Sequence, residues 1–195
     1  MSKLYFRYSA MNSGKTTRVI QEAYNYEERG HMVVIMKPLV DEKGQDRIIS
    51  RLGLERRADI LIEPQSDVGQ LLANWLLERT VSCVFVDEAQ FLEPQQVDQL
   101  LRFTVEQRIP VITYGLRTDF QMRGFPGSTR LLEIAHHLEE IPNICGCGKK
   151  ARYNGRKVNG QFVFSGQQVV IDNQQNVEYE ALCASCYLGH RDQAD

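Results

Sequence analysis

The stretch SAMNSGKTT, residues 9–17, decides the fold of this 195-residue chain. It matches the phosphate-binding loop pattern G-x-x-x-x-G-K-[ST] at every fixed position except the first, where Ser9 stands in place of glycine. In such a loop, backbone N–H groups and a helix N-terminus face the phosphates of a nucleotide. Serine is small enough for this turn, so we expect the loop to bind phosphate. The alternative is a chance S-G-K-T in an ordinary turn.

Three residue types in this loop have a defined chemical task. Gly14 gives the turn its conformational freedom and lets the phosphates approach closely. Lys15 supplies a positive charge for the terminal phosphates, and the Thr16 hydroxyl is placed to bind Mg²⁺. A phosphate loop requires a strand before it and a helix after it, and the flanking sequence meets both requirements.

Strand and helix patterns alternate along the chain. Strands are predicted at residues 3–10, 32–37, 58–63, 81–91 and 109–116, and helices at 14–30, 66–80, 93–108 and 128–140. Ser66 is the expected N-cap of the second helix, and Pro94 lies near the first turn of the third. This alternation predicts an α/β fold, a P-loop parallel sheet flanked by helices.

The strand at 81–91 ends in two acidic residues, Asp87 and Glu88. Ligands of an open α/β sheet bind at the carboxyl ends of its strands, so Asp87 is expected near Thr16 as a Mg²⁺ ligand. Glu88 is expected to point elsewhere, as a general base or as a solvated acid. The predicted ATP- and Mg-binding residues are Ser9, Ala10, Met11, Asn12, Ser13, Gly14, Lys15, Thr16, Asp87, Glu88, Ala89 and Gln90.

The composition changes near residue 141, which predicts two domains, 1–140 and 141–195. The second is too short to be stable through its own core, so we expect a covalent or metal crosslink. Its two cysteine pairs, Cys145 with Cys147 and Cys183 with Cys186, have spacings that suit a closed, structural Zn²⁺ site. The alternative is free or redox-active thiols. Cys83, inside an apolar strand, is predicted to be core.

Composition excludes several classes of protein. A net charge of −2 gives no electrostatic reason to expect a nucleic-acid partner. No apolar run approaches a membrane span, and Lys3 and Arg7 interrupt any signal-peptide core. We therefore expect a cytoplasmic protein, without membrane contact, whose cysteines are reduced.

The loop at 114–128 carries three apolar residues, Leu116, Phe120 and Phe125, that could enclose a flat base. Exposed phenylalanines are otherwise unfavourable, although the loop could instead pack onto the C-terminal domain. Two functions fit this chemistry, a phosphotransferase and a nucleic-acid-stimulated ATPase. The chain is too short for the two core domains of a helicase, and its basic residues form no stripe.

The segments MNSGKT, FVDEAQF and YGLRTDF, followed by the paired cysteines, resemble the type II thymidine kinase family in its bacterial form. The resemblance implies transfer of the γ-phosphate of ATP to the 5′-hydroxyl of thymidine or deoxyuridine, with Mg²⁺ and a structural Zn²⁺. It makes Glu88 the general base. It also implies a homotetramer, inhibition by the triphosphate end product dTTP, and a lasso loop over the nucleoside, here residues 154–179. The substrate-binding residues that it implies are Met11, Leu116, Phe120, Phe125, Ile171 and Tyr179.

The chain departs from this family in two places. The lasso has Asp172 and Asn173 where two glycines are usual, and Asn and Asp are the next most tolerant residues of unusual backbone angles. The segment after the second strand reads Asp41-Glu42-Lys43 in place of Asp-x-Arg, so a phosphate contact there would lack the bidentate geometry of arginine.

Overall fold

The computed structural model describes residues 2–39, 46–168 and 176–193. Its centre is a six-stranded sheet of order β5-β2-β6-β7-β1-β8 in which every neighbouring pair is parallel. The strands are β1 (Leu4–Ser9), β2 (Val33–Pro38), β5 (Ile60–Ile62), β6 (Cys83–Val86), β7 (Val111–Leu116) and β8 (His137–Glu140). The predicted parallel α/β sheet is therefore confirmed.

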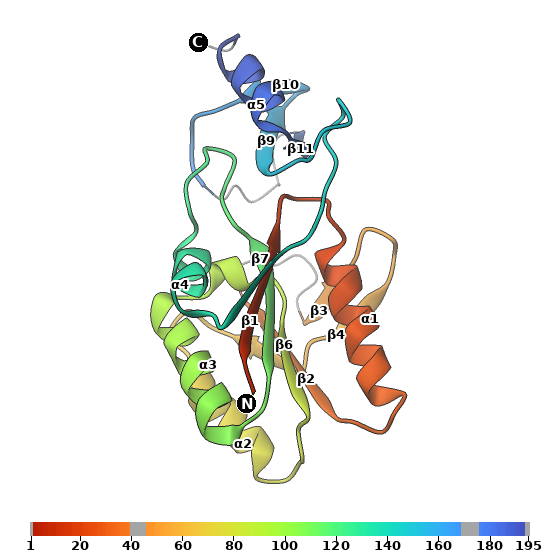
Figure 1. Ribbon diagram of the computed structural model, residues 1–195, viewed down its shortest axis with the longest axis vertical. Helices are drawn as coiled ribbons and strands as arrows, with labels where there is room; N and C mark the ends of the chain where they lie inside the picture. The colour runs from red at the N-terminus through yellow and green to blue at the C-terminus, as the bar shows by residue number, and fades with distance from the viewer. Residues whose placement is uncertain (1, 40–45, 169–175, 194–195) are drawn as a thin grey trace.

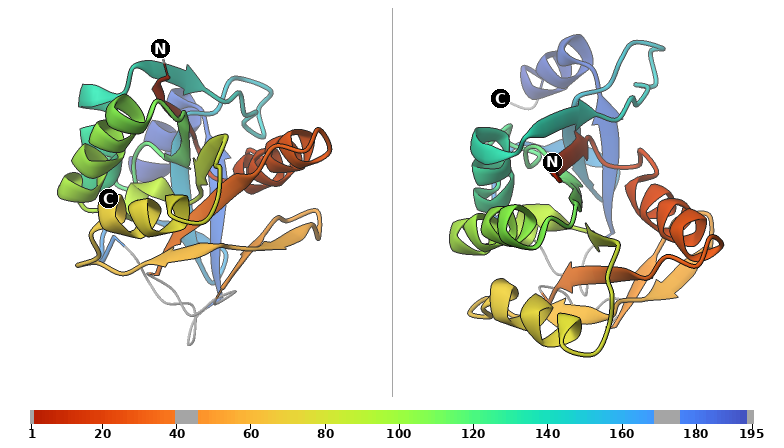
Figure 2. Two further views of the ribbon diagram at one scale, coloured as in Figure 1. Left: turned by 90° about the horizontal axis from the view of Figure 1, so that it is seen from below. Right: turned by 60° about the horizontal axis from the view of Figure 1, so that its bottom comes forward.

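Helices cover both faces of this sheet. On one face lies α1 (Lys15–Glu27), and on the other lie α2 (Val68–Leu76), α3 (Pro94–Gln107) and α4 (Pro126–Ile134) (Figures 1 and 2). Each face has its own apolar cluster, one built around Phe85 and Tyr114 under α1, the other around Phe6 and Leu100 under α2 to α4. Burial on both faces explains why β2, β6 and β7 are continuous apolar runs in the sequence.

The helix starts follow local side-chain chemistry. Pro94 is the first residue of α3, as predicted, and Glu93 and Gln96 form a capping box there. The predicted N-cap of α2 was wrong by one residue: Asp67 is the cap, and its carboxylate accepts a hydrogen bond of 2.9 Å from the Gln70 N–H. Ser66 instead accepts a hydrogen bond from the N–H of Glu63, so its hydroxyl closes the preceding turn.

Residues 137–140 correct another prediction, because they form β8 rather than the end of a helix. After α4 ends at Ile134, the N–H of His136 donates to the carbonyl of Leu4, and the N–H of Ile141 donates to that of Tyr8. The open edge of β1 thus recruits this segment as a sixth strand. The structure also contains a hairpin of β3 (Arg47–Ile49) and β4 (Glu55–Arg57), which the sequence pattern did not indicate.

The C-terminal part forms a separate, three-stranded antiparallel sheet of order β10-β9-β11, followed by α5 (Ala184–Arg191). Its strands are β9 (Tyr153–Val158), β10 (Gln161–Val163) and β11 (Val177–Leu182), and they lie beyond the carboxyl ends of the central strands (Figure 1). Ala10 and Met122 from the first part pack with Leu182 and Tyr187 in a third apolar cluster.

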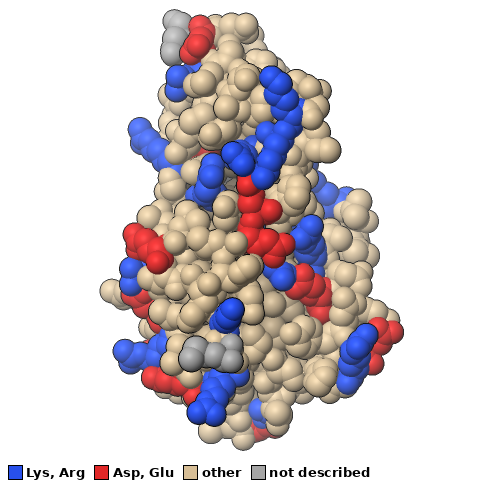
Figure 3. Space-filling model, in the orientation of Figure 1, with Lys and Arg blue, Asp and Glu red and all other residues tan. Residues whose placement is uncertain are grey.

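Charges are mixed over the molecular face drawn in Figure 3, where acidic groups border basic ones. Glu140 of β8 is paired with Lys150 and Arg152, at 2.5 and 3.1 Å, which ties the edge of the central sheet to the C-terminal part. Within the described ranges, the helices are too short or too polar to span a bilayer.

Candidate active site

The phosphate loop connects β1 to α1, and its backbone explains the serine at its start. The left-handed conformations of the loop fall on Asn12 and Gly14, with φ of 64° and 75°. Ser9 is the last residue of β1 and is not among the residues with positive φ, so glycine is not required there. Its hydroxyl also bonds to Ser13, which joins the two ends of the loop.

Lys15 lies folded against the loop that it follows. Its side chain is only 8% exposed, and its Nζ donates hydrogen bonds to the carbonyl of Ala10 at 3.1 Å and to the hydroxyl of Ser9 at 3.2 Å. Burial lowers the pKa of Lys15, while Glu88 and Asp87 oppose that shift. Two nearby carboxylates therefore favour the charged ammonium that phosphate binding needs.

Asp87 follows the last residue of β6 and is buried beside the loop. Burial and the charge of Glu88 together raise the pKa of Asp87 to about 7, although a hydrogen bond from Thr16 opposes the shift. The structure thus places the Thr16 hydroxyl near the Asp87 carboxylate, as predicted. Two such oxygens form part of the ligand set that Mg²⁺ prefers.

Glu88 is not a strand residue, so the alternation of strand side chains does not apply to it. It has φ of 52° and precedes the 3-10 turn η1 (Ala89–Phe91). It raises the pKa values of both Lys15 and Asp87, which places its carboxylate in their site and not away from it. Glu88 accepts a hydrogen bond from Gln90, whose Oε1 in turn accepts the Leu116 N–H at 3.0 Å. Buried Gln90 therefore fixes Glu88 relative to β7.

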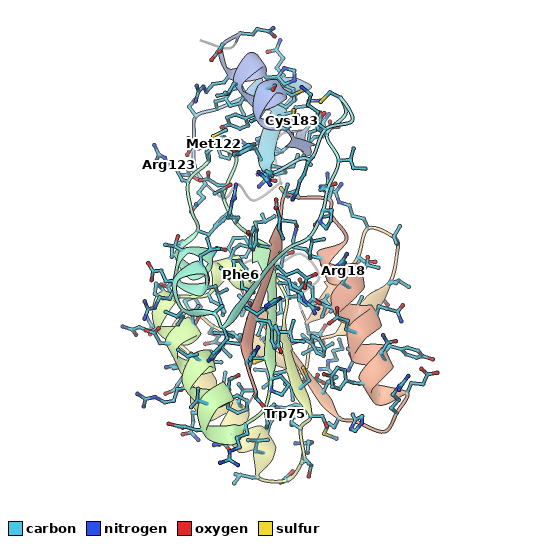
Figure 4. The ribbon with its side chains drawn as sticks, viewed as in Figure 1. Phe6, Arg18, Trp75, Met122, Arg123 and Cys183 are labelled. Atoms are coloured by element: carbon cyan, nitrogen blue, oxygen red, sulfur yellow. The ribbon has the colours of Figure 1, made fainter. Side chains whose placement is uncertain are left out.

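A pocket of about 620 Å³ contains both Lys15 and Glu88. It is lined by Met11, Asn12, Ser13, Gly14, Lys15, Thr16, Thr17, Arg18, Ile49, Ser50, Arg51, Leu52, Glu88 and Leu116. Ser9, Ala10, Asp87, Ala89 and Gln90 lie outside this lining, and Ala89 is part of the core. The sequence did not point to Thr17 or Arg18, in the first turn of α1 (Figure 4), or to Ile49 at the end of β3 and the three residues that follow it. The Gly53 in that segment was the available signal of a turn.

Phe120 and Phe125, the phenylalanines predicted to enclose a base, are buried in the loop after β7. Phe120 is 1% exposed and Phe125 is 5% exposed. The guanidinium of Arg156 covers the Phe120 ring at 3.7 Å, and Phe125 meets Phe91 edge to face at 5.7 Å. The hydroxyl of Tyr187 donates to the Phe120 carbonyl at 2.6 Å. The loop therefore packs onto the C-terminal part, the alternative left open by the sequence, and Figure 4 shows Met122 and Arg123 extending it toward that part.

One asparagine of β9 joins three segments of the site. Asn154 is 2% exposed, its Oδ1 accepts the Met11 N–H at 2.7 Å, and its Nδ2 donates to the Thr118 carbonyl at 2.8 Å. Nearby, Asn12 donates to the backbone carbonyl of Tyr179 at 3.0 Å. These contacts fix the phosphate loop to both the β7 loop and the C-terminal sheet.

Several residues of the sequence prediction lie outside the described residues. They are Ile171, Asp172 and Asn173 in the lasso, and Asp41, Glu42 and Lys43 after β2. Tyr179 is described and is half-buried on β11.

The four predicted zinc ligands converge. The sulfur atoms of Cys145, Cys147, Cys183 and Cys186 all lie within 4.8 Å of one another, and those of Cys147 and Cys183 are 3.6 Å apart. With Zn–S bonds of about 2.3 Å, a tetrahedral site puts neighbouring sulfurs about 3.8 Å apart, so this cluster fits Zn²⁺. The N–H of Cys186 lowers the pKa of Cys183 to about 7, which favours a thiolate. Cys83, by contrast, is buried in β6, as predicted.

Comparison with known proteins gives one consistent result. A family model described as thymidine kinase matches residues 2–187. A thymidine kinase of Rhizobium meliloti is 48% identical over 187 residues, which cover 92% of this chain and 94% of the relative. A thymidine kinase of Ruegeria pomeroyi is 45% identical over 94% of this chain and 92% of the relative. One from Francisella tularensis subsp. holarctica is 37% identical, over 94% and 95% respectively.

Proposed function

The chain belongs to the thymidine kinase family, and from that premise we propose that it transfers the γ-phosphate of ATP to the 5′-hydroxyl of thymidine or deoxyuridine. The observation that carries this proposal is the shared pocket of Lys15 and Glu88. Phosphoryl transfer depends on positioning and on neutralising charge, with one group to accept the proton of the attacking hydroxyl. Lys15 supplies the charge in this proposal, and Glu88 accepts the proton.

The donor end of the pocket is the phosphate loop. Its backbone N–H groups and the start of α1 would hold the phosphates of ATP, with the Lys15 ammonium moving from the Ala10 carbonyl to a phosphate oxygen. Thr16 and Asp87 would hold Mg²⁺, which neutralises the phosphate oxygens when bound. Gln90, held between Glu88 and Leu116, keeps the proposed base at a fixed position relative to the acceptor side.

The acceptor end is formed by Met11 and Leu116, which line the same pocket. Phe120, Phe125, Ile171 and Tyr179 complete the proposed nucleoside contacts. The rings of Phe120 and Phe125 are buried in this structure, as is Leu116, which lines the pocket. A lasso that excludes water would keep ATP from being hydrolysed in place of transfer.

The remaining parts of the proposal rest on the resemblance to the family. We propose a structural Zn²⁺ on the four cysteines, a division into domains 1–140 and 141–195, a cytoplasmic location, a homotetramer and inhibition by dTTP. The converging sulfur atoms support the zinc, and the separate C-terminal sheet supports the division. Mass measurement of the native protein in solution tests the tetramer, and titration of dTTP into the kinase assay tests the inhibition.

A panel of nucleosides with Mg-ATP tests the proposed function. Thymidine and deoxyuridine should give the highest kcat/KM, and purine nucleosides should give little product. Single-stranded DNA is added in a separate arm. If DNA stimulated ATP hydrolysis while none of the nucleosides was phosphorylated, the nucleic-acid-stimulated ATPase would replace the kinase.

A further inference from the structure

The turn between β3 and β4 forms one wall of the pocket that contains the phosphate loop. Ile49, Ser50, Arg51 and Leu52 line that pocket together with the loop residues. Figure 1 shows the hairpin beside α1, and the first-turn residues of α1, from Lys15 to Arg18, line the same pocket. Nothing in the mechanism above uses this hairpin, although it presents both a cation and apolar surface to the proposed donor site.

The turn is held in a defined shape. The N–H of Ser50 donates to the Leu54 carbonyl at 2.8 Å, and the Ser50 hydroxyl accepts the Leu54 N–H at 3.1 Å. Gly53 has φ of 82°, a conformation that favours glycine. At the base of the hairpin, Ile48 is buried in the core under α1, and Arg56 makes two hydrogen bonds of 2.6 Å to Glu27 of α1. The wall is therefore fixed to the helix that starts the phosphate site.

Arg51 is unlike the other arginines of this hairpin. Arg47 pairs with Glu55, Arg56 with Glu27 and Arg57 with Asp46. Within the part of the chain that the structure describes, no ion pair or hydrogen bond involves Arg51. It lies close enough to Lys15 for its charge to lower the pKa of that ammonium. Lys15 and Arg51 thus face one pocket together with Arg18, which is paired with Glu139. An anion between Lys15 and Arg51 would relieve their repulsion.

The apolar neighbours of Arg51 are exposed to solvent. Leu52 is 78% exposed and Ile49 is 54% exposed, yet both border the pocket. Exposed aliphatic groups on a rigid turn gain free energy when a ligand covers them. A ligand that combines several negative charges with an apolar part would match both features of this wall.

We propose that Arg51 binds the phosphate tail of the donor nucleotide from the side opposite the phosphate loop. This inference rests on the proposed function for its choice of ATP as the ligand. Guanidinium groups bind phosphate oxygens through two parallel hydrogen bonds, which lysine cannot reproduce. Arg51 thereby adds a second, geometrically selective cation to the charge of Lys15, and Leu52 packs against the rest of the nucleotide.

Direct binding measurements with ATP, inorganic tripolyphosphate and adenosine test this inference without any need for turnover. Arg51→Ala should raise the Kd of ATP and of tripolyphosphate by about tenfold, the low end for a charge-assisted pair because Arg51 is exposed. For Arg51→Lys, the Kd of ATP and of tripolyphosphate should lie between the values for Arg51→Ala and for the wild type. The Kd of adenosine, which has no phosphates, should stay within about twofold in both variants.

Arg57→Ala is the matched control, since it removes a cation from the same hairpin but one that pairs with Asp46. It should bind all three ligands as the wild type does. The inference is overturned if Arg51→Ala binds ATP normally, if it weakens adenosine as much as ATP, or if Arg57→Ala has the same effect. If the wild type fails to phosphorylate thymidine but Arg51→Ala still loses ATP binding, the proposed function fails and the role of Arg51 stands.

Discussion

Replacing Asn154 with alanine tests whether the C-terminal sheet holds the phosphate loop in place. The change removes a side chain that is 2% exposed and that makes hydrogen bonds of 2.7 Å to the Met11 N–H and 2.8 Å to the Thr118 carbonyl. It leaves one donor and one acceptor of the backbone without partners. A single substitution therefore removes hydrogen bonds to two segments of the proposed active site, the phosphate loop and the loop after β7.

The expected magnitude follows from the burial of these groups. Leaving a buried polar group unpaired costs about 1–3 kcal/mol. Met11 and Thr118 are only partly buried, so water replaces some of the lost bonding and the low end applies to each. We expect Asn154→Ala to lower the free energy of unfolding by about 2 kcal/mol, with Tm falling by about 2–4 °C for each kcal/mol. Asn154→Asp should lower it more, because a carboxylate would face the Thr118 carbonyl without a proton to donate.

Urea denaturation measures this free energy, and the kinase assay should show a raised KM for the nucleoside because Met11 loses its anchor. Asn74→Ala is the matched control, an exposed asparagine of α2 that accepts one side-chain hydrogen bond from Gln70. The control should change stability by less than about 0.5 kcal/mol. An Asn154→Ala protein as stable as the control, with an unchanged KM, would refute the proposed link.

Three further predictions concern the chemistry of the site. Glu88→Gln should keep ATP binding but lower kcat by about 10²–10⁴, because it removes the proposed base. Rapid-quench kinetics measures the rate of phosphoryl transfer, and an unchanged rate would count against this role of Glu88. Elemental analysis should find about one zinc per chain. Cys183→Ser should lose the zinc, and the control Cys83→Ser should retain it. A wild-type protein without zinc would contradict the proposed site. Without Mg²⁺ and nucleotide, stability should fall as pH rises from about 4 to 7, because the pKa of Asp87 rises from 3.8 to about 7 on folding, so the native state binds more protons in that window. Asp87→Asn should flatten this slope in denaturation curves, and an equal slope in both proteins would count against the assignment.

The parts of this protein that sequence could predict are those in which the signal is local. The phosphate loop is one continuous segment whose residue types match its backbone, with Gly14 at a left-handed position and Ser9 at an ordinary one. The cysteine pairs likewise identify their cluster by spacing. Buried strands such as β6 are apolar throughout because both faces of the sheet are covered.

The parts that sequence could not predict depend on partners distant in the chain. Residues 137–140 continue a helical pattern, but the unpaired edge of β1 supplies backbone partners that outweigh helix propensity. Nothing near Phe120 in sequence indicates that Arg156, 36 positions later, covers its ring, so packing of this loop onto the C-terminal part stayed an open alternative. Glu88 departs from strand geometry because its φ of 52° turns the chain directly after β6.

Transfer of labelled γ-phosphate from ATP to thymidine, by the wild type and by Lys15→Ala in parallel, tests the central claim most directly. The account predicts labelled thymidine monophosphate from the wild type and a loss of at least about a hundredfold in the variant, because the Lys15 ammonium neutralises the transferred phosphoryl group. Equal transfer by both proteins, or no transfer by the wild type with Mg²⁺ present, would contradict it.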